Sequence, residues 1–547
     1  YNFTSQKYLI DTPSCKIPDI DPFIDEIERF YRHEEYTPCS KEHLLSYIEK
    51  NNGYTTLNIN RSVVHLYTST RIYCCYSKIT RYVTAEKPDD IIDISKLNLV
   101  RTMPKTYGFL EKNNFINLKG YMKVGLNTLP NLMAMLAGQT MKQVEKFCDY
   151  TNKIDDCPNI WKQFKKLGYI TAYGEDSSYI SSFNYNKKGF LYPPTDFYFR
   201  PYILAAEKLQ IIERKNMYYC TGPETEGERI MNLAKDFQIT LKQYPKFGLF
   251  WMNSFSHEDL NMASAMDEKI EDFLENIYKH LDKTILFFFS DHGFRFGEIR
   301  NTYTGWVEER LPFFYVYLPE IFKTNYPAKY NNFFINSQRL TNAFDIYMTL
   351  QDILVLADEN FPLERSLACP KCHSLFAEVS NKRTCSDAAI ETEWCVCNLP
   401  TYINTEEVIV QNAAHFFVNK INTLMKSYPQ SHKCYEYRLK TVTYSGISQF
   451  TDKKNQTRTG LLLRIKTTPK AIFESLIELS HGSDSQLRLE GDISRLNRYA
   501  PYTKCIESSS LEKYCYCKED IFAKIKKNFF CKIDRSLNCI YHNMDHR

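Results

Sequence analysis

The fold is decided by one stretch of the chain, Thr284-Ile285-Leu286-Phe287-Phe288-Phe289 followed directly by Ser290-Asp291-His292-Gly293. Six mostly β-branched or aromatic residues predict a strand that is buried on both faces, as in the centre of a parallel sheet. In open α/β sheets, sites form at the carboxyl ends of the strands. Asp291 and His292 would therefore offer one oxygen and one nitrogen to a metal, and a capped turn is the structural alternative.

Three further apolar runs predict neighbouring strands, at 169–173, 247–252 and 313–318, with amphipathic helical patterns between them. This alternation predicts an α/β fold with a mostly parallel sheet and helices on both of its faces. We expect three regions: a Cys-containing N-terminal lead-in over 1–85, the α/β catalytic core over 86–365, and a smaller Cys-rich, disulfide-stapled α+β module over 366–547.

Thr128 lies at the start of a predicted helix, because Val124-Gly-Leu-Asn-Thr128 is a polar loop and an apolar run ending at Gly138 follows it. The amino end of a helix carries partial positive charge, which suits a nucleophile or an oxyanion. The alternative is that Asn127 or Thr128 simply caps the helix. Both interpretations stay open at this point.

The 18 cysteines and three N-glycosylation sequons, at Asn2, Asn60 and Asn455, indicate an oxidising compartment. We therefore expect a secreted or extracellular, glycosylated, disulfide-bonded protein. A zinc ribbon built on Cys369 and Cys372 is the competing interpretation, because those two residues have ligand spacing.

Composition excludes several other classes of protein. A net charge of +4 over 547 residues gives no support for nucleic acid as a partner. No run of eighteen apolar residues occurs, so a membrane would be reached only through an N-terminal anchor absent from this sequence. The chain begins at Tyr1 rather than Met, which leaves soluble secretion and such tethering equally open.

A set of motifs in this sequence resembles the sulfatase-like family of the alkaline phosphatase superfamily, in its animal extracellular branch filed as domain of unknown function 229. The resemblance covers about 90–540. It is carried by Arg101-Thr-Met-Pro-Lys-Thr-Tyr107, Asn127-Thr-Leu-Pro-Asn131, Gly168-Tyr-Ile-Thr-Ala-Tyr-Gly-Glu-Asp176, Pro194-Thr-Asp196, Ser290-Asp-His-Gly-Phe-Arg-Phe-Gly297, Glu308-Glu-Arg-Leu-Pro312, Phe344-Asp-Ile-Tyr347 and Trp394-Cys-Val-Cys397.

The resemblance implies a metal-dependent hydrolase or phosphotransferase whose substrate is an anionic phosphate or sulfate ester. Thr128 would be the nucleophile and a metal ligand, and Asp93, Asp291 and His292 would be further ligands. His257 and Arg295 would contact the anionic group or protonate the leaving oxygen. One divalent ion, Zn²⁺, Ca²⁺ or Mn²⁺, is expected rather than two, because no His lies between His292 and His373 and Tyr347 occupies the place of such a ligand.

Two departures from the family pattern bear on activity. Thr128 replaces the Cys that sulfatases oxidise to formylglycine, which favours phosphate over sulfate. The first strand is shortened, and Asp93 falls one residue away from the ligand position, which would turn its side chain to the opposite face. Asp89 and Asp90 are substitute ligands. The alternative function is a catalytically inactive sulfatase-like glycoprotein that acts as a binding or structural protein.

Overall fold

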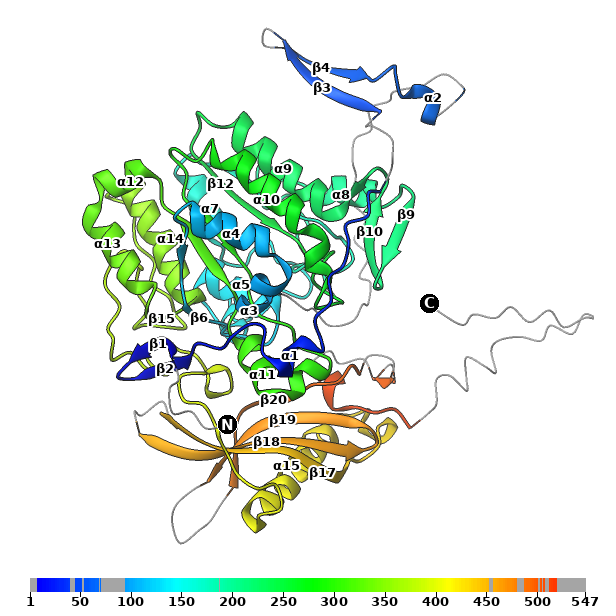
Figure 1. Ribbon diagram of the computed structural model, residues 1–547, viewed down its shortest axis with the longest axis vertical. Coiled ribbons are helices and arrows are strands. Elements are labelled where there is room, and N and C mark those ends of the chain that lie inside the picture. The colour runs from blue at the N-terminus through cyan, green and yellow to red at the C-terminus, as the bar shows by residue number, and fades with distance from the viewer. Residues whose placement is uncertain are drawn as a thin grey trace, which may run out of the picture. The chain divides into compact units, whose positions relative to one another are not determined.

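The computed structural model describes residues 7–39, 45–51, 54–67, 69, 94–185, 187–451, 456–479, 487–499, 502–503, 505–506 and 511–518. Asp89, Asp90 and Asp93 lie outside the described residues, as do Asn2 and Asn455. The chain divides into two compact units, one made of 1–399 with 449–457 and the other of 400–448 with 458–547 (Figure 1).

The first unit has an α/β fold in which parallel and antiparallel strand pairs occur together. Its parallel pairs join β7 (Ile170–Glu175) to β12 (Lys246–Trp251) and β8 (Phe197–Tyr198), and β6 (Gly120–Met122) to β15 (Leu340–Asn342). Its antiparallel pairs join β14 (Phe314–Tyr317) to β13 (Leu286–Phe289) and β5 (Ile116–Asn117).

Helices cover both faces of these strands. Alternate side chains of a strand point in opposite directions, so each face contributes to its own apolar core. Phe314 and Val316 of β14 lie in one apolar core, whereas Phe313 and Tyr315 lie in another. The first core includes residues of α5 (Thr128–Ala137), α7 (Ile160–Lys166), α13 (Pro327–Asn336) and α14 (Ala343–Ala357). The second includes residues of α3 (Lys96–Thr102), α4 (Pro104–Lys112), α9 (Glu226–Thr240) and α10 (Asp267–Tyr278).

The decisive strand differs from its prediction in two respects. The strand β13 begins at Leu286 rather than Thr284, its residues are half-buried, and its described partner is antiparallel. The physical reason is the connection between β13 and β14. Phe289, the last residue of β13, pairs with Phe314, the first residue of β14, so the two strands run in opposite directions. This connection includes α11 (Tyr303–Arg310), whose residues 304–310 are all buried.

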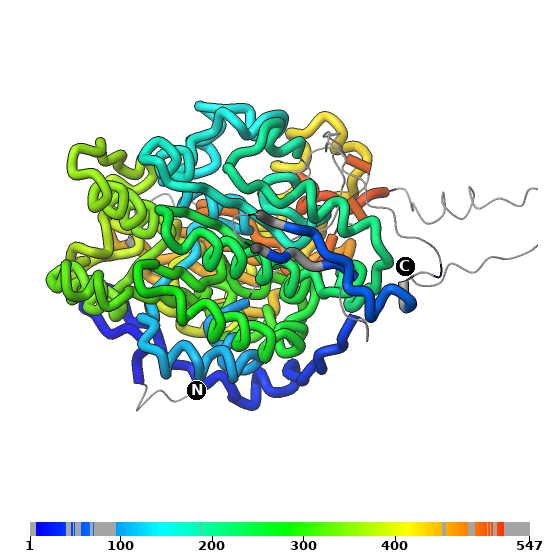
Figure 2. Tube along the Cα trace, turned by 90° about the horizontal axis from the view of Figure 1, so that it is seen from above, coloured from blue at the N-terminus to red at the C-terminus, as the bar shows by residue number. Residues whose placement is uncertain are grey.

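The N-terminal segment runs along the outside of the first unit, as the dark-blue tube in Figure 2 shows. It contains β1 (Tyr8–Thr12), β2 (Cys15–Pro18) and α1 (Asp25–Glu28). Disulfides Cys15–Cys397 and Cys39–Cys220 fasten it at two places. Further along the chain come β3 (Ser46–Asn51), β4 (Tyr54–Ile59) and α2 (Val64–Tyr67); the unit also contains α6 (Met141–Val144), α8 (Arg200–Ala206), β9 (Ile211–Arg214), β10 (Met217–Thr221), β11 (Glu224–Thr225) and α12 (Glu320–Asn325).

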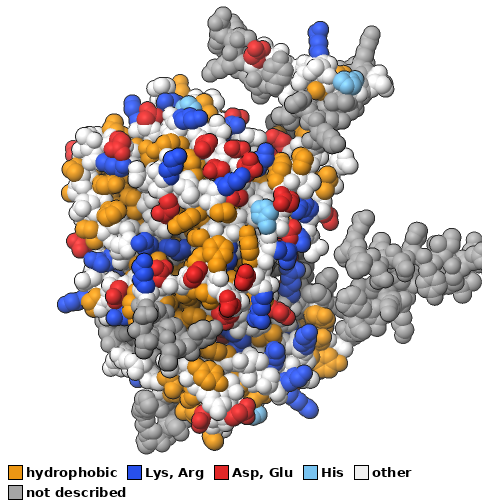
Figure 3. All heavy atoms as spheres, in the orientation of Figure 1, with side chains coloured by type: hydrophobic (Ala, Val, Ile, Leu, Met, Phe, Trp, Pro, Cys, Tyr) orange, Lys and Arg blue, Asp and Glu red, His pale blue; other side chains and the backbone are white. Residues whose placement is uncertain are grey.

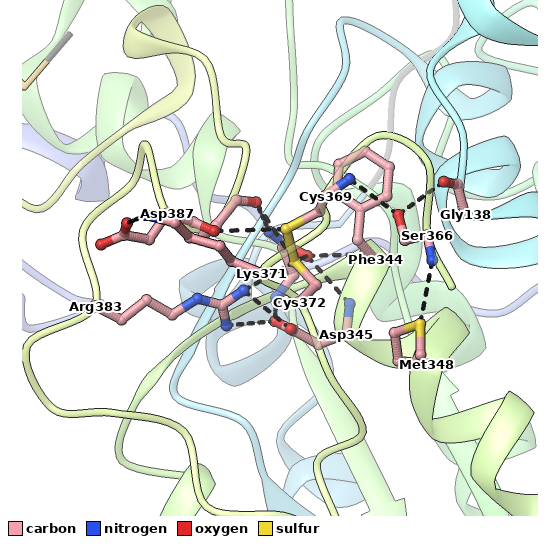
Figure 4. Close-up of a disulfide and its surroundings, with 12 residues drawn as sticks. Gly138, Phe344, Asp345, Met348, Ser366, Cys369, Lys371, Cys372, Arg383 and Asp387 are labelled. Carbon is pink, nitrogen blue, oxygen red and sulfur yellow. Dashed lines mark hydrogen bonds and ion pairs between the residues drawn. A yellow bond between two sulfur atoms is a disulfide. The ribbon is translucent and has the colours of Figure 1, made fainter. Parts of the chain in front are cut away.

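The segment 366–399 lies in the first unit, whereas the change of pattern in the sequence predicted that it belongs to the C-terminal module. Cys369 and Cys372 form a disulfide, which rules out the zinc ribbon proposed on these two residues. Figure 4 shows the guanidinium of Arg383 beside this disulfide, paired with Asp345 of α14 at 2.8 Å. Ser366 Oγ donates to Gly138 O at 2.7 Å, so the segment also binds the carboxyl end of α5.

The second unit is an α+β module in which α15 (Val408–Lys426) packs on a five-stranded sheet. The sheet order is β16 (Thr401–Tyr402), β17 (Arg438–Thr451), β18 (Thr457–Thr468), β19 (Ala471–Leu479) and β20 (Leu487–Arg495). Disulfides Cys434–Cys515 and Cys505–Cys517 cross-link the chain within this unit.

The face of the molecule drawn in Figure 3 carries acidic and basic side chains intermingled over most of its area. Such mixing agrees with the small net charge of +4. In the described part of the chain, no helix combines the length and the hydrophobicity that a membrane span requires.

Candidate active site

A short loop between β6 and α5 positions Thr128. The side-chain oxygen of Asn131 accepts hydrogen bonds from the backbone N–H groups of Val124 and Gly125 at 2.8 and 3.0 Å. The amide nitrogen of Asn131 donates to the carbonyls of Gly125 and Asn127 at 3.1 and 3.0 Å. One buried side chain thus holds both ends of the loop, and Thr128 follows as the first residue of α5.

The Thr128 hydroxyl is buried and has no hydrogen-bond partner in the protein. Asn127 occupies the capping position with extended backbone angles, but its side chain makes no capping hydrogen bond. The interpretation that Asn127 or Thr128 simply caps the helix is therefore wrong. A buried hydroxyl left unpaired costs about 1–3 kcal/mol, which makes Thr128 Oγ1 a candidate for contact with a ligand. It also lies at the positive end of the α5 dipole.

Asp291 and His292 follow β13 directly and are almost completely buried. Asp291 Oδ1 accepts from the backbone N–H of His292 at 3.0 Å, whereas Oδ2 has no hydrogen-bond partner. His292 Nδ1 lies 2.9 Å from Gly293 O, and Nε2 has no hydrogen-bond partner. A proton on Nδ1 that is donated to this carbonyl leaves a lone pair on Nε2, which is 3.7 Å from Asp291 Oδ2.

Two basic side chains share this environment with the Asp-His pair. Burial lowers the pKa of His292, Asp291 raises it, and Lys123 and Arg295 lower it further. The imidazole is therefore held in its neutral form, which is the form that binds metals. Arg295 is 6% exposed and its Nη1 has no hydrogen-bond partner, so a positive charge is available to an anionic ligand.

His257 is carried by the segment that follows β12. Its Nδ1 lies 2.8 Å from Glu258 Oε1, but neither of the two buried ring nitrogens has a hydrogen-bond partner. Asp176, at the end of the neighbouring strand β7, holds this segment by accepting from the backbone N–H groups of Asn253 and Ser254 at 2.8 and 3.0 Å. Asp176 closes one of the family motifs, but its role was not evident from the sequence.

The donors fit a divalent cation in kind but do not form a complete protein shell. Thr128 Oγ1, Asp291 Oδ2 and His292 Nε2 are an oxygen, an oxygen and a nitrogen, all buried and without protein partners. Within the described residues, the groups of three His, Cys, Asp or Glu ligand atoms that lie close together are Cys385-Cys395-Cys397 and Cys434-Cys505-Cys515. All of these sulfurs belong to disulfides, so neither group offers thiolates.

Tyr347 does not occupy a ligand position beside Thr128. Its hydroxyl accepts from Gln351 Nε2 at 3.1 Å, and a Cβ built on Gly138 would lie 2.5 Å from its ring. Gly138 ends α5 and Thr128 begins it, and a helix of this length extends about 15 Å at 1.5 Å per residue. The Tyr347 ring therefore packs at the end of α5 that is remote from Thr128.

Sequence comparison defines the family to which the chain belongs. The family model described as "Protein of unknown function (DUF229)" matches residues 90–443, and the chain is a member of this family. No curated protein matches the chain significantly.

The chain is also similar to several solved structures. The phosphonate monoester hydrolase from Silicibacter pomeroyi is 10% identical with a TM-score of 0.37, covering 74% of this chain and 90% of its own. The corresponding enzyme from Agrobacterium radiobacter is 11% identical with a TM-score of 0.37, covering 71% and 88%. A candidate sulfatase from Bacteroides fragilis is 11% identical with a TM-score of 0.33, covering 83% and 94%. These similarities are too remote for an activity to be transferred from them.

Proposed function

We propose that this protein is a metal-dependent hydrolase or phosphotransferase acting on phosphate esters, with Thr128 as its nucleophile. The observation that carries the proposal is a set of unpaired atoms, Thr128 Oγ1, Asp291 Oδ2 and His292 Nε2, buried in a chain whose motifs resemble the sulfatase-like family. Buried polar atoms are ordinarily paired, so unpaired ones are candidates for contact with a ligand or an ion.

Asp291, His292 and Thr128 would hold one divalent ion, which when bound lowers the pKa of the Thr128 hydroxyl and offsets charge on the transferring group. The fourth protein ligand would be Asp93. Support for this choice comes from the residue that follows it, because the carbonyl of Ile94 accepts from Ser290 Oγ at 2.5 Å and Ser290 precedes Asp291.

Arg295 and His257 act on the substrate in the proposed reaction. The unpaired Nη1 of Arg295 supplies a donor and a positive charge to the oxygens of the phosphate group, as phosphoryl transfer requires. Glu258 Oε1 lies 2.8 Å from Nδ1 of the buried His257 ring, whose Nε2 would give a proton to the leaving oxygen. Phosphate is favoured over sulfate because a threonine cannot be converted to formylglycine.

The sulfur chemistry supports a proposal about the compartment. All fourteen described cysteines form disulfides, which persist in oxidising surroundings. We therefore place the enzyme in the secretory pathway or outside the cell, with Asn60 as a site for a glycan.

The experiment compares wild type with Thr128→Ala on an aryl phosphodiester, a phosphonate monoester, a phosphomonoester and a sulfate ester. Protein is first treated with a chelator and then given Mn²⁺, Zn²⁺ or Ca²⁺. We expect metal-dependent turnover of a phosphorus ester that falls about a thousandfold or more in the variant. Thr349→Ser, in a buried position on α14, is the matched control and keeps the activity. Bound metal with turnover that does not depend on Thr128 would contradict the proposal, and bound metal without turnover would favour the binding-protein alternative.

A further inference from the structure

Three consecutive charged residues at the carboxyl end of α11 are almost completely buried, which is unusual for charged side chains. They are Glu308, Glu309 and Arg310, at 3%, 2% and 2% exposure. Burial of carboxylates without partners is costly, so these groups are expected to be paired. The side-chain partners of the two glutamates include residues of the segment 95–101 and of the loop that leads to Thr128.

Glu308 holds the chain that leads into α3. Its Oε2 accepts from Ser95 Oγ and from Arg101 Nη2, each at 2.6 Å. Ser95 also caps α3 by accepting from Asn98 N, and Lys96 N donates to Leu311 O at 3.0 Å. The segment that begins immediately after Asp93 is thus fastened to the end of α11.

Glu309 holds the start of the nucleophile loop. Its Oε1 pairs with the ammonium of Lys123, which is completely buried and lies 3.9 Å from the centre of the Trp394 ring. Its Oε2 accepts from Arg310 Nη1 at 2.8 Å. Lys123 N in turn donates to Arg310 O at 3.2 Å. Lys123 is the first residue after β6, and five residues later the chain reaches Thr128.

The backbone of the same two glutamates supports the Asp291-His292 loop. Gly293 N donates to Glu309 O at 3.2 Å. A Cβ on Gly293 would lie 2.2 Å from Glu308 O, a contact that no side chain can make. This close approach explains why Gly must follow the Asp-His pair.

We propose that Glu308 and Glu309 are positioning residues that set the three site loops, 94–98, 123–128 and 290–293, in register with one another. The catalytic consequence of this inference rests on the proposed function, whereas its structural consequence rests on the hydrogen bonds alone. Glu308 fixes the loop expected to present Asp93, so it controls metal affinity. Glu309 fixes the loop that presents Thr128, so it controls the rate of the chemical step. Outer groups of this kind typically change metal affinity or activity 10–100-fold.

The test uses Glu308→Gln and Glu309→Gln, which keep the shape of each side chain and remove its charge, in the full chain. Hydrogen–deuterium exchange is measured on metal-free protein, and Mn²⁺ affinity, kcat and KM are measured on an aryl phosphodiester. The matched control is Arg383→Met, which breaks a buried ion pair of the same unit outside the three loops.

We expect Glu309→Gln to increase exchange in peptides covering 123–131 and to lower kcat about 10–100-fold, with KM changed less than about threefold. Glu308→Gln should increase exchange over 94–102 and weaken Mn²⁺ binding about 10–100-fold. The double variant Lys123→Met with Glu309→Met removes both charges of the buried ion pair. It should restore part of the protection of the 123–128 loop against hydrogen exchange.

Exchange that rises evenly over the first unit, or a fall in kcat no larger than in Arg383→Met, would overturn the inference, because both indicate a merely structural role. The inference is equally overturned if neither loop changes its exchange. If wild type has no metal-dependent turnover but each variant loosens its own loop, the proposed function fails while the positioning of the loops by Glu308 and Glu309 is supported.

Discussion

Replacing Thr128 by Val should stabilise the metal-free protein while it removes activity. The side chains have the same shape and are both β-branched, so packing and helix propensity barely change. What is lost is a buried hydroxyl that has no hydrogen-bond partner, and such a group costs about 1–3 kcal/mol. The free energy of unfolding should therefore rise by about 1–3 kcal/mol in Thr128→Val.

Thr349 supplies the matched control for this prediction. It is equally buried, but its hydroxyl donates to Asp345 O at 2.7 Å and accepts from Leu375 N at 2.9 Å. Thr349→Val leaves a buried N–H without a partner and should lower the free energy of unfolding by about 1–3 kcal/mol. The same chemical change is thus expected to have opposite signs at two buried positions on two helices.

Urea unfolding followed by tryptophan fluorescence measures the stability change of both variants in the first unit, which contains Thr128 and Thr349. The chain has four tryptophans, and all of them lie in the first unit: Trp161, Trp251, Trp306 and Trp394. The experiment is done with a chelator and repeated with Mn²⁺, where binding should stabilise wild type more than Thr128→Val. If Thr128→Val without metal is destabilised as Thr349→Val is, the hydroxyl has a structural partner and the reasoning is refuted.

Three further predictions concern stability and sulfur chemistry. Burial raises the pKa of Glu175 from 4.5 to about 7, so between these two pH values the folded chain keeps a proton that the unfolded chain releases. The free energy of unfolding should therefore fall with rising pH by up to about 3 kcal/mol, and urea midpoints that vary equally with pH in Glu175→Gln would contradict this. Arg383→Met should cost about 3–5 kcal/mol because it leaves the buried Asp345 without its cation, and a thermal shift near zero would show that the pair is not formed. Peptide mapping without reduction should find Cys369 linked to Cys372, and free thiols or bound zinc at these positions would contradict the pairing.

The ends of local patterns were predictable from the sequence. The apolar run that stops at Asp291 and the polar loop that leads into Thr128 each depend on neighbours within a few residues, and both are present in the structure. The family was also predictable, because motifs such as Ser290-Asp-His-Gly293 are specific when several occur in order, and the family model confirms it.

Long-range pairing was not predictable in the same way. The direction of β14 beside β13 depends on a connection of more than twenty residues, and periodicity carries no information about where such a connection returns. Cys395 and Cys397 illustrate the same limit, because they bind Cys385 and Cys15 respectively. Side chains two apart in an extended segment share a direction, yet the partners come from opposite ends of the unit.

The glutamates of α11 belong to one of the motifs quoted from the sequence, but their role was missed for a different reason. Consecutive charges at a helix end ordinarily indicate a solvated surface, and only the tertiary structure reveals that Glu308 and Glu309 are buried. A usable signal was the run Trp306-Val-Glu-Glu-Arg-Leu311, in which charges are flanked by apolar residues on both sides. Asp93 is still a prediction, since it lies outside the described residues.

The most direct test of the proposed site is an anomalous difference map from crystals of the full chain grown with Mn²⁺ at a concentration that supports turnover. We expect one peak within coordinating distance of Thr128 Oγ1, Asp291 Oδ2 and His292 Nε2, about 2.0–2.5 Å from each. The peak should disappear in His292→Gln. A map with Mn²⁺ bound elsewhere and no density beside these three atoms would contradict the proposed site.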